Sequence, residues 1–267
     1  MDFTLTTYKK LLLAFQSAGY TFQTFEQFLS QPADGKVVVL RHDVDELAGN
    51  ALKIAQLEHK LNVNATYYFR IVKQSNNAQV IKQIVEFGHE IGYHYEDLNM
   101  AEGNMEKAEK NFAKNLEYFR SFYPVRTVAM HGSSSGKFDN RDFWNQHKLA
   151  DYGLIGEPYL SVDFTKIFYL TDTGYAWDGG KYAVRDVVEN HFGITFHSTS
   201  QVVEAIQQGT FPKKCMILAH TLWTDSLLQW INLHLREFFR NRVKQLSQRS
   251  ALVKKIYSNL VRLYWKR

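Results

Sequence analysis

The segment KVVVLRHDVD, residues 36–45, joins a run of β-branched and aliphatic residues directly to charged and imidazole side chains. Its apolar part, residues 36–40, lacks polar alternation, which is typical of a strand buried on both faces of a parallel sheet. In extended backbone, side chains two residues apart lie on one face, so Asp43 and Asp45 are expected together. The segment therefore predicts a buried parallel strand that leads into two carboxylates.

Strands and helices alternate along the chain on both sides of this segment. Further strand-like runs are found at residues 63–71, 90–93, 125–130 and 214–219, and helical patterns at residues 46–60, 77–87 and 103–122. Strands separated by helices imply βαβ units and a mostly parallel sheet. We expect an α/β fold, a distorted or incomplete (β/α) barrel of about seven strands, in which residues 146–199 supply short strands and loops. A doubly wound open sheet is the alternative.

Both ends of the chain carry additional helical patterns. Residues 6–18 form a helical pattern that ends at Gly19, and residues 25–29 suggest a second short helix. We therefore divide the 267 residues into an N-terminal helical extension (1–35), a barrel (36–225) and a basic amphipathic helical segment (226–267). This length suits a single barrel domain.

Composition narrows the class of protein. The chain is 45% hydrophobic and 22% charged, as globular proteins are, and its single cysteine, Cys215, permits no internal disulfide. We see no signal-peptide core and no apolar run near the roughly 20 residues of a membrane span. The sequence thus predicts a soluble cytoplasmic protein, with the inner face of the membrane as a second location.

The net charge of +5 is concentrated in the last part of the chain. Between Arg236 and Arg267 there are ten basic residues, and Glu237 is the only acidic one. One interpretation is a helix docked on the barrel with a solvated basic face, and the other is a basic amphipathic helix at an anionic membrane surface. No nucleic-acid partner is expected, because no known binding motif is present.

Histidine and aspartate follow four of the predicted strands. Asp43 and Asp45 follow the first of them, and His94, His131 and His220 follow three others. In parallel α/β folds the active site lies at the carboxyl ends of the strands. Core packing alone would not explain this convergence, because buried polar groups without partners are costly.

Two adjacent carboxylates repel each other unless a positive group lies between them, and a divalent metal provides one. His94 and His131 can complete a His/His/Asp ligand set, which favours zinc or another divalent transition metal, and His220 is then available as a general acid. Other interpretations stay open. A DxD pair also occurs in turns and caps, His131 could contact substrate or support a ligand, and His220 could be a hydrogen-bonded strand-end residue.

Four segments resemble those of one family: RHDVD (41–45), GHEIG (88–92) followed by His94, YLTDTGYAW (169–177) and ILAH (217–220). Over about residues 37–221 the chain resembles the polysaccharide deacetylase superfamily (NodB-homology, carbohydrate esterase family four), in its divergent RHDVD branch. The resemblance implies Asp43 as catalytic base, Asp45 and His94 as metal ligands and His220 as acid. It also suggests that Arg41, Asp172 and Trp177 bind substrate.

The chain departs from the family pattern at two places. The family has a second histidine four residues after the first, where this chain has Leu98, so His131 is the expected third ligand. The family's arginine-proline motif is also absent from residues 127–132. The resemblance implies metal-dependent removal of an acetyl or other acyl group from an N-acetylated sugar or surface-polysaccharide precursor, with a lipid-linked form among the candidate substrates. The alternative is a non-catalytic glycan- or membrane-associated protein on a deacetylase scaffold.

Overall fold

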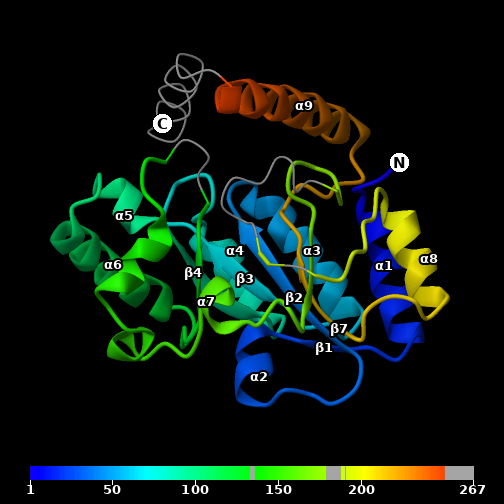
Figure 1. Ribbon diagram of the computed structural model, residues 1–267, viewed down its shortest axis with the longest axis horizontal. Coiled ribbons are helices and arrows are strands. Elements are labelled where there is room, and N and C mark those ends of the chain that lie inside the picture. Colours follow the sequence, from blue (N-terminus) through cyan, green and yellow to red (C-terminus); the bar gives the residue numbers. More distant parts are fainter. Residues whose placement is uncertain (133–135, 179–187, 190, 250–267) are drawn as a thin grey trace.

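A computed structural model describes residues 1–132, 136–178, 188–189 and 191–249 of the chain. Its centre is one sheet of parallel strands, ordered β5-β4-β3-β2-β7-β6, with β1 paired to the first half of β2 (Figure 1). The strands are β1 (Thr21–Gln23), β2 (Val37–Val44), β3 (Thr66–Phe69), β4 (Glu90–Tyr95), β5 (Val128–Met130), β6 (Phe168–Thr171) and β7 (Lys214–Leu218).

The strand order is that of a barrel left open at one place. Strands β2 to β5 follow one another in space, and β7 pairs with the other side of β2 and carries β6 beyond it. Within the described residues no pairing joins β5 to β6, so the circle stays open there. The predicted incomplete (β/α) barrel is confirmed. The strand order differs from that of the alternative, a doubly wound open sheet.

Helices cover the outside of this half-barrel (Figure 1). Several begin with a side chain that accepts a backbone N–H, such as Thr4, Asn77, Asn104 and Ser198. They are α1 (Leu5–Ser17), α2 (Phe25–Ser30), α3 (Ala48–Lys60), α4 (Ala78–Glu86), α5 (Asp97–Met100), α6 (Met105–Arg120), α7 (Pro158–Ser161), α8 (Thr199–Gln207) and α9 (Leu227–Arg249), with 3₁₀ turns at Asn140–Asn145 and Leu149–Tyr152. No helix in these ranges is long and apolar enough to span a membrane.

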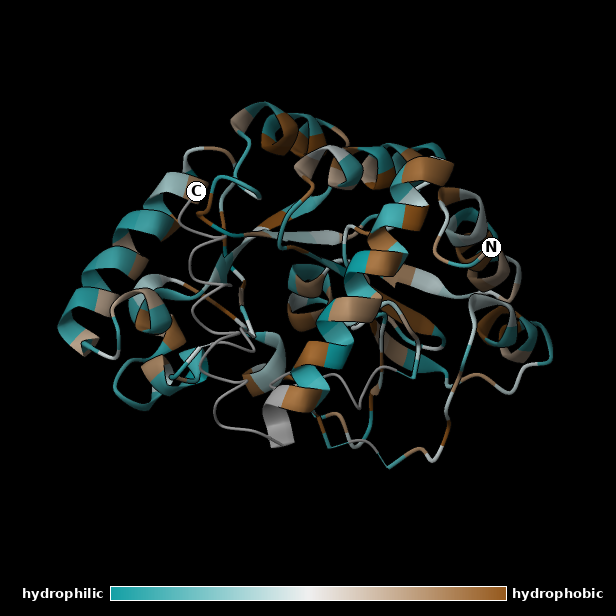
Figure 2. Ribbon diagram, turned by 90° about the horizontal axis from the view of Figure 1, so that it is seen from above, coloured by the Kyte–Doolittle hydropathy of each residue, from teal (hydrophilic) through white to brown (hydrophobic). Residues whose placement is uncertain are grey.

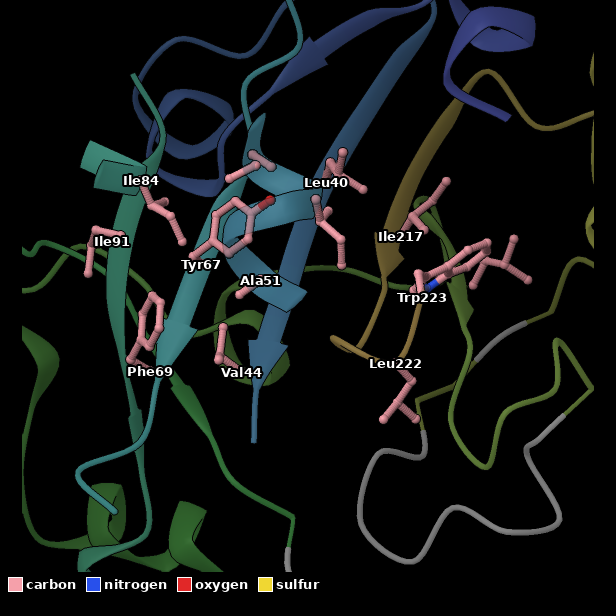
Figure 3. Close-up of a cluster of buried hydrophobic side chains, with 14 of the residues drawn as sticks. Leu40, Val44, Ala51, Tyr67, Phe69, Ile84, Ile91, Ile217, Leu222 and Trp223 are labelled. Carbon is pink, nitrogen blue, oxygen red and sulfur yellow. The ribbon is translucent and has the colours of Figure 1, made fainter. Parts of the chain in front are cut away.

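Strand β2 shows how the sheet separates a core from a site. All eight of its residues are buried. Val38, Leu40 and Val44 join the large cluster under the helices, which Figure 3 shows together with Tyr67, Phe69 and Ile217 of neighbouring strands. The alternate residues of β2 point into the half-barrel, where Val37 and Val39 belong to a second apolar cluster. Further along that inner face the residues are Arg41 and Asp43.

Several element bounds differ from the sequence-based ones. Strand β2 continues through Val44 and β4 through Tyr95, so His42, Asp43 and His94 lie within strands. These polar residues can stay in a buried sheet because each has a partner, such as Glu58 for His42. Strand β1 lies within the expected helical extension and pairs with the sheet. Of the expected terminal helix, residues 250–267 lie outside the described ranges.

Candidate metal centre

The carboxyl ends of three strands bring the predicted metal ligands together. Asp45 directly follows β2, His94 lies near the end of β4, and His131 directly follows β5. His131 Nδ1 lies 2.9 Å from Asp45 Oδ1, and His94 Nε2 lies 3.4 Å from the same oxygen and 3.3 Å from His131 Nδ1. One possible ligand atom from each of the three residues lies within 4.8 Å of the other two.

The bonding around these three residues is compatible with a bound metal. His94 Nδ1 lies 2.9 Å from the carbonyl oxygen of Ala129, which fixes that nitrogen as the donor and leaves the lone pair on Nε2 facing the centre. Asp45 Oδ1 is inaccessible to solvent and has no hydrogen bond of regular geometry within the described residues. Two imidazole nitrogens and a carboxylate oxygen form a donor set that suits zinc and related divalent metals.

The pair Arg70–Glu96 lies behind His131. Arg70 Nε and Nη2 donate to the two oxygens of Glu96 at 2.7 and 2.9 Å, and Glu96 Oε2 lies 3.9 Å from His131 Nε2. Both residues directly follow strands, β3 and β4, so the strand-end rule that selected the other site residues would have found them. The pair places a carboxylate beside the ring nitrogen of His131 that faces away from Asp45.

Both aspartates of the RHDVD segment are held in the ionised form. Burial acts to raise the pKa of Asp45, but the imidazoles of His131 and His94 hold it well below its usual range. Burial acts in the same direction on Asp43, whose pKa is nevertheless lowered by the guanidinium of Arg41 and by His94. Asp43 Oδ2 lies 3.6 Å from His94 Nε2, at the edge of the three-residue cluster.

Arg41 lies in a different place from the one expected for a substrate contact. Its side chain is fully buried, and Nη2 donates to Asp43 Oδ2 at 2.6 Å and to Oδ1 at 2.9 Å. The guanidinium also lies 5.4 Å from the ring centre of Tyr68 and 5.2 Å from that of Tyr159. Arg41 therefore pairs with Asp43, the expected base, and does not face solvent.

His220 is held by Asp172, the second residue for which a substrate contact was expected. Asp172 is fully buried and lies 2.7 Å from His220 Nδ1, and it also accepts the backbone N–H of His220 and Nε1–H of Trp223. No described residue hydrogen-bonds to His220 Nε2. Burial acts to lower the pKa of His220, but Asp172 outweighs it and the pKa rises to about 10. Asp172 is therefore placed to orient and charge the imidazole.

Trp177, the third residue expected to bind substrate, lies in the core. It is 5% exposed, and its indole N–H donates to Thr199 at the start of α8. A hollow of about 260 Å³ lies elsewhere, lined by residues that include Arg141, Tyr159, Asp163 and Phe164. Because Tyr159 also contacts Arg41, this hollow adjoins the half-barrel on the side of Arg41 and Asp43.

The remaining histidines of these segments, His42 and His89, hydrogen-bond to groups outside the three-residue cluster. His42 points to the helix side and lies 2.8 Å from Glu58, and His89 lies 3.1 Å from the carbonyl oxygen of Ala55. Leu98, where the family has its second histidine, is 4% exposed and packs in the core from α5. The position at which the family has its second histidine is therefore part of the apolar core in this chain.

No family model matches the sequence, and no curated protein matches it. The chain is similar to solved structures of carbohydrate esterase family four (CE4). One is a CE4 family pseudoenzyme from Bacillus anthracis, with 18% identity and a TM-score of 0.44, covering 78% of this chain and 62% of that one. This chain thus spans less than two thirds of that neighbour. A mutant of the same pseudoenzyme with restored enzymatic activity matches with 17% identity, a TM-score of 0.44 and coverage of 78% and 64%.

Two further neighbours are named as a deacetylase and an esterase. A mutant of the peptidoglycan deacetylase PdaC from Bacillus subtilis matches with 12% identity, a TM-score of 0.41 and coverage of 87% of this chain and 98% of that one. A family 4 carbohydrate esterase from Streptomyces lividans, in complex with acetate, matches with 13% identity, a TM-score of 0.39 and coverage of 76% and 88%. These neighbours come from the superfamily that the sequence motifs resemble. The function proposed below rests on this chain's own residues.

Proposed function

We propose that this protein is a metal-dependent hydrolase that removes an acetyl group from an N-acetylated sugar or a surface-polysaccharide precursor. The observation that carries the proposal is the convergence of Asp45, His94 and His131, flanked by Asp43. A divalent metal held by the three residues, for which zinc is our candidate, would supply Lewis-acid chemistry and make a nearby water more acidic. All of these residues lie at the carboxyl ends of parallel strands, where such sites occur.

Asp43 is the residue that we assign as the base. Its pairing with Arg41 keeps the carboxylate ionised and fixes its orientation beside His94. In the proposed reaction Asp43 takes a proton from water while the water oxygen forms a bond to the acetamide carbon. Arg41 acts through Asp43 and takes the place of an arginine from the missing arginine-proline motif.

His220 is the residue that we assign as the acid. Asp172 holds the imidazole by Nδ1, which leaves Nε2 for the leaving group, and a pKa of about 10 keeps the ring protonated at neutral pH. As the C–N bond breaks, Nε2 gives its proton to the departing amine, and acetate and the free amino sugar result. The hollow beside Tyr159 is our candidate for holding the sugar, in place of Trp177. We place the reaction in the cytoplasm, with a lipid-linked form of the sugar among its substrates.

The test combines metal analysis with acetate release from N-acetylated chitooligosaccharides. We expect the wild-type protein to bind zinc and release acetate, Asp45→Ala to lose both, and Asp43→Asn to keep the metal but lose the activity. His197→Ala is the matched control, because His197 is exposed and bonds only to residues outside the site. A wild-type protein that binds no metal, or an Asp45→Ala variant that stays fully active, would contradict the proposal.

The second candidate is a non-catalytic glycan-binding protein on the same scaffold, which Leu98 favours because it leaves one ligand position of the family empty. This candidate predicts no acetate release from any N-acetylated glycan, together with glycan binding that is unchanged in Asp43→Asn. Acetate release separates the two candidates, and isothermal titration with the same oligosaccharides tests whether a protein without activity still binds the glycan.

A further inference from the structure

Helix α9 differs from an ordinary surface helix, because polar residues as well as the buried Leu233 face the protein, while most of its large apolar residues are exposed. Glu237 and Asn241 are 4% and 7% exposed, and Asn241 Nδ2 donates to the carbonyl oxygen of Gly174 at 2.7 Å. Arg236 Nη2 lies 2.6 Å from Glu46 Oε1, and Trp230 Nε1 donates to the carbonyl oxygen of Asp2 at 2.7 Å. Ion pairs and hydrogen bonds thus anchor the inner face of α9.

The outer face of α9 is apolar. Exposed fractions of its large apolar residues run from 42% for Ile231 to 81% for Leu228. Figure 2 views α9 from outside and shows hydrophobic residues recurring along it. The exposed large apolar residues mostly recur every three or four residues, as in a stripe along one side of a helix. They are Leu227, Leu228, Ile231, Leu235, Phe238, Phe239 and Leu246. A contiguous exposed apolar stripe is typical of an interaction surface.

An exposed arginine beside this stripe, and the basic sequence around it, favour an anionic partner. Residues 236–267 contain ten basic residues and one acidic residue, Glu237, which faces inward. Arg242 is exposed, and its guanidinium lies 5.2 Å from the ring centre of Phe238 on the apolar stripe. A second copy of the chain docked on this face would bring two basic segments together, which like-charge repulsion disfavours.

We propose that the outer face of α9 docks on a lipid bilayer with anionic headgroups. Leucine, isoleucine and phenylalanine side chains would enter the boundary between headgroups and acyl chains, and the arginines and lysines would pair with lipid phosphates. The large apolar side chains of this surface, with the exposed Arg242 among them, fit a bilayer better than an acidic protein. The docking requires no catalysis and is independent of the proposed function.

Helix α9 contacts residues close to the candidate metal centre. Its inner face contacts Glu46, which directly follows Asp45, and Gly174, which follows β6. Helix α9 therefore lies over the edge of the barrel that carries the metal centre (Figure 1). If the proposed hydrolase function holds, docking would bring this edge close to the membrane and to sugars attached to lipid.

The test is vesicle flotation of the full chain, using phosphatidylcholine vesicles with and without about one third phosphatidylglycerol. We expect binding to the anionic vesicles, weaker binding to the neutral ones, and weakening by high salt. A variant carrying Ile231→Ser, Leu235→Ser, Phe238→Ser and Phe239→Ser should bind at least about tenfold more weakly, because the apolar area that enters the bilayer is lost. Leu13→Ser with Leu160→Ser is the matched control, since both residues are exposed apolar residues away from α9.

A second variant, Arg242→Glu, keeps the test independent of any folding defect in the fourfold variant, and it should also weaken binding to anionic vesicles. Asp43→Asn should bind as the wild type does, which separates docking from chemistry. No binding of the wild type to anionic vesicles would overturn the proposal, as would unchanged binding of the fourfold variant. A concentration-dependent dimer that only the fourfold variant loses, without vesicle binding, would identify the face as a contact between two copies instead.

Discussion

His131 Nδ1 lies 2.9 Å from Asp45 Oδ1, although β5 and β2 are separated by two other strands of the sheet. Adjacent strands lie about 4.8 Å apart, so three spacings in a flat sheet would separate these strands by about 14 Å. The curvature of the half-barrel brings their carboxyl ends together. Bringing Asp45 and His131 together therefore depends on the curvature of the barrel. His131 is the candidate for the third ligand, whose usual position in the family is occupied here by Leu98 of α5.

The first prediction concerns His131 as the third ligand. His131→Ala should weaken zinc binding by about tenfold or more, measured by competition with a chelating dye. Restoring the family histidine by Leu98→His in this background should not recover the affinity, because Leu98 packs in the apolar core and a histidine there would be buried without a partner. Full recovery in the double variant would show that the metal uses the position of Leu98.

The second prediction concerns the buried pair of Arg41 and Asp43. Arg41→Ala should lower the free energy of unfolding by about 3–5 kcal/mol, measured by urea denaturation in the presence of chelator, because it leaves a buried carboxylate unpaired. The pKa of Asp43 is depressed in the folded state, so the pair stabilises the protein above the unfolded pKa and loses this effect as pH falls. Arg41→Met with Asp43→Asn should be less destabilised than Arg41→Ala, and an equal loss would argue against this account.

The sequence predicted which residues meet at the carboxyl ends of the strands better than it predicted the positions of Arg41, Asp172 and Trp177. Asp45, His94 and His131 follow from one rule, that parallel strands deliver their polar ends to one edge. Asp172 and Trp177 were assigned from a local motif, and the residues that determine their roles, His220 and Thr199, lie 48 and 22 positions away. Local pattern alone does not identify such distant partners.

The same limit applies to helix α9. Its existence follows from the helical pattern after residue 226, but which side faces the barrel depends on Glu46 and Gly174, far away in the sequence. Apolar periodicity by itself predicts that the apolar side is buried, because that is the ordinary arrangement. In this chain, ion pairs and hydrogen bonds hold a largely polar side of α9 against the barrel, with Leu233 as the buried apolar residue among them. The pair of Arg41 and Asp43 could instead have been predicted from the sequence. The two residues are two positions apart in one strand, so their side chains lie on the same face.

The third prediction concerns the pH dependence that Asp172 imposes through His220. The pKa of His220 is raised from 6.5 to about 10 in the folded state, so the stabilisation is full below about pH 6.5 and is lost as pH rises toward 10. Asp172→Asn should reduce this loss, measured by urea denaturation across that range. The variant should also move the alkaline limb of the pH profile of acetate release to lower pH, because His220 would give up its proton more readily. An unmoved alkaline limb would argue against His220 as the acid.

The fourth prediction concerns Gly92, the last residue of the GHEIG segment. A Cβ atom at this position would lie 2.3 Å from the ring of Tyr68 and 2.9 Å from the carbonyl oxygen of Thr127, so both neighbours would have to move. Gly92→Ala should therefore lower the free energy of unfolding by about 1–3 kcal/mol, measured by urea denaturation. Tyr68 also lies against the guanidinium of Arg41, so its displacement should lower acetate release more than the same loss of stability elsewhere would.

The matched control for Gly92 is Gly49→Ala, because Gly49 lies in the first turn of α3 and a Cβ atom there would meet nothing within 4 Å. This substitution should leave acetate release unchanged and raise the free energy of unfolding by about 0.5–1 kcal/mol, since alanine favours the helix. If both alanine variants behaved alike, the close approach of Gly92 to Tyr68 would not explain why this position requires glycine. A Gly92→Ala protein that lost stability but kept full activity would limit the role of Gly92 to folding and would separate the position of Tyr68 from the chemistry at Asp43.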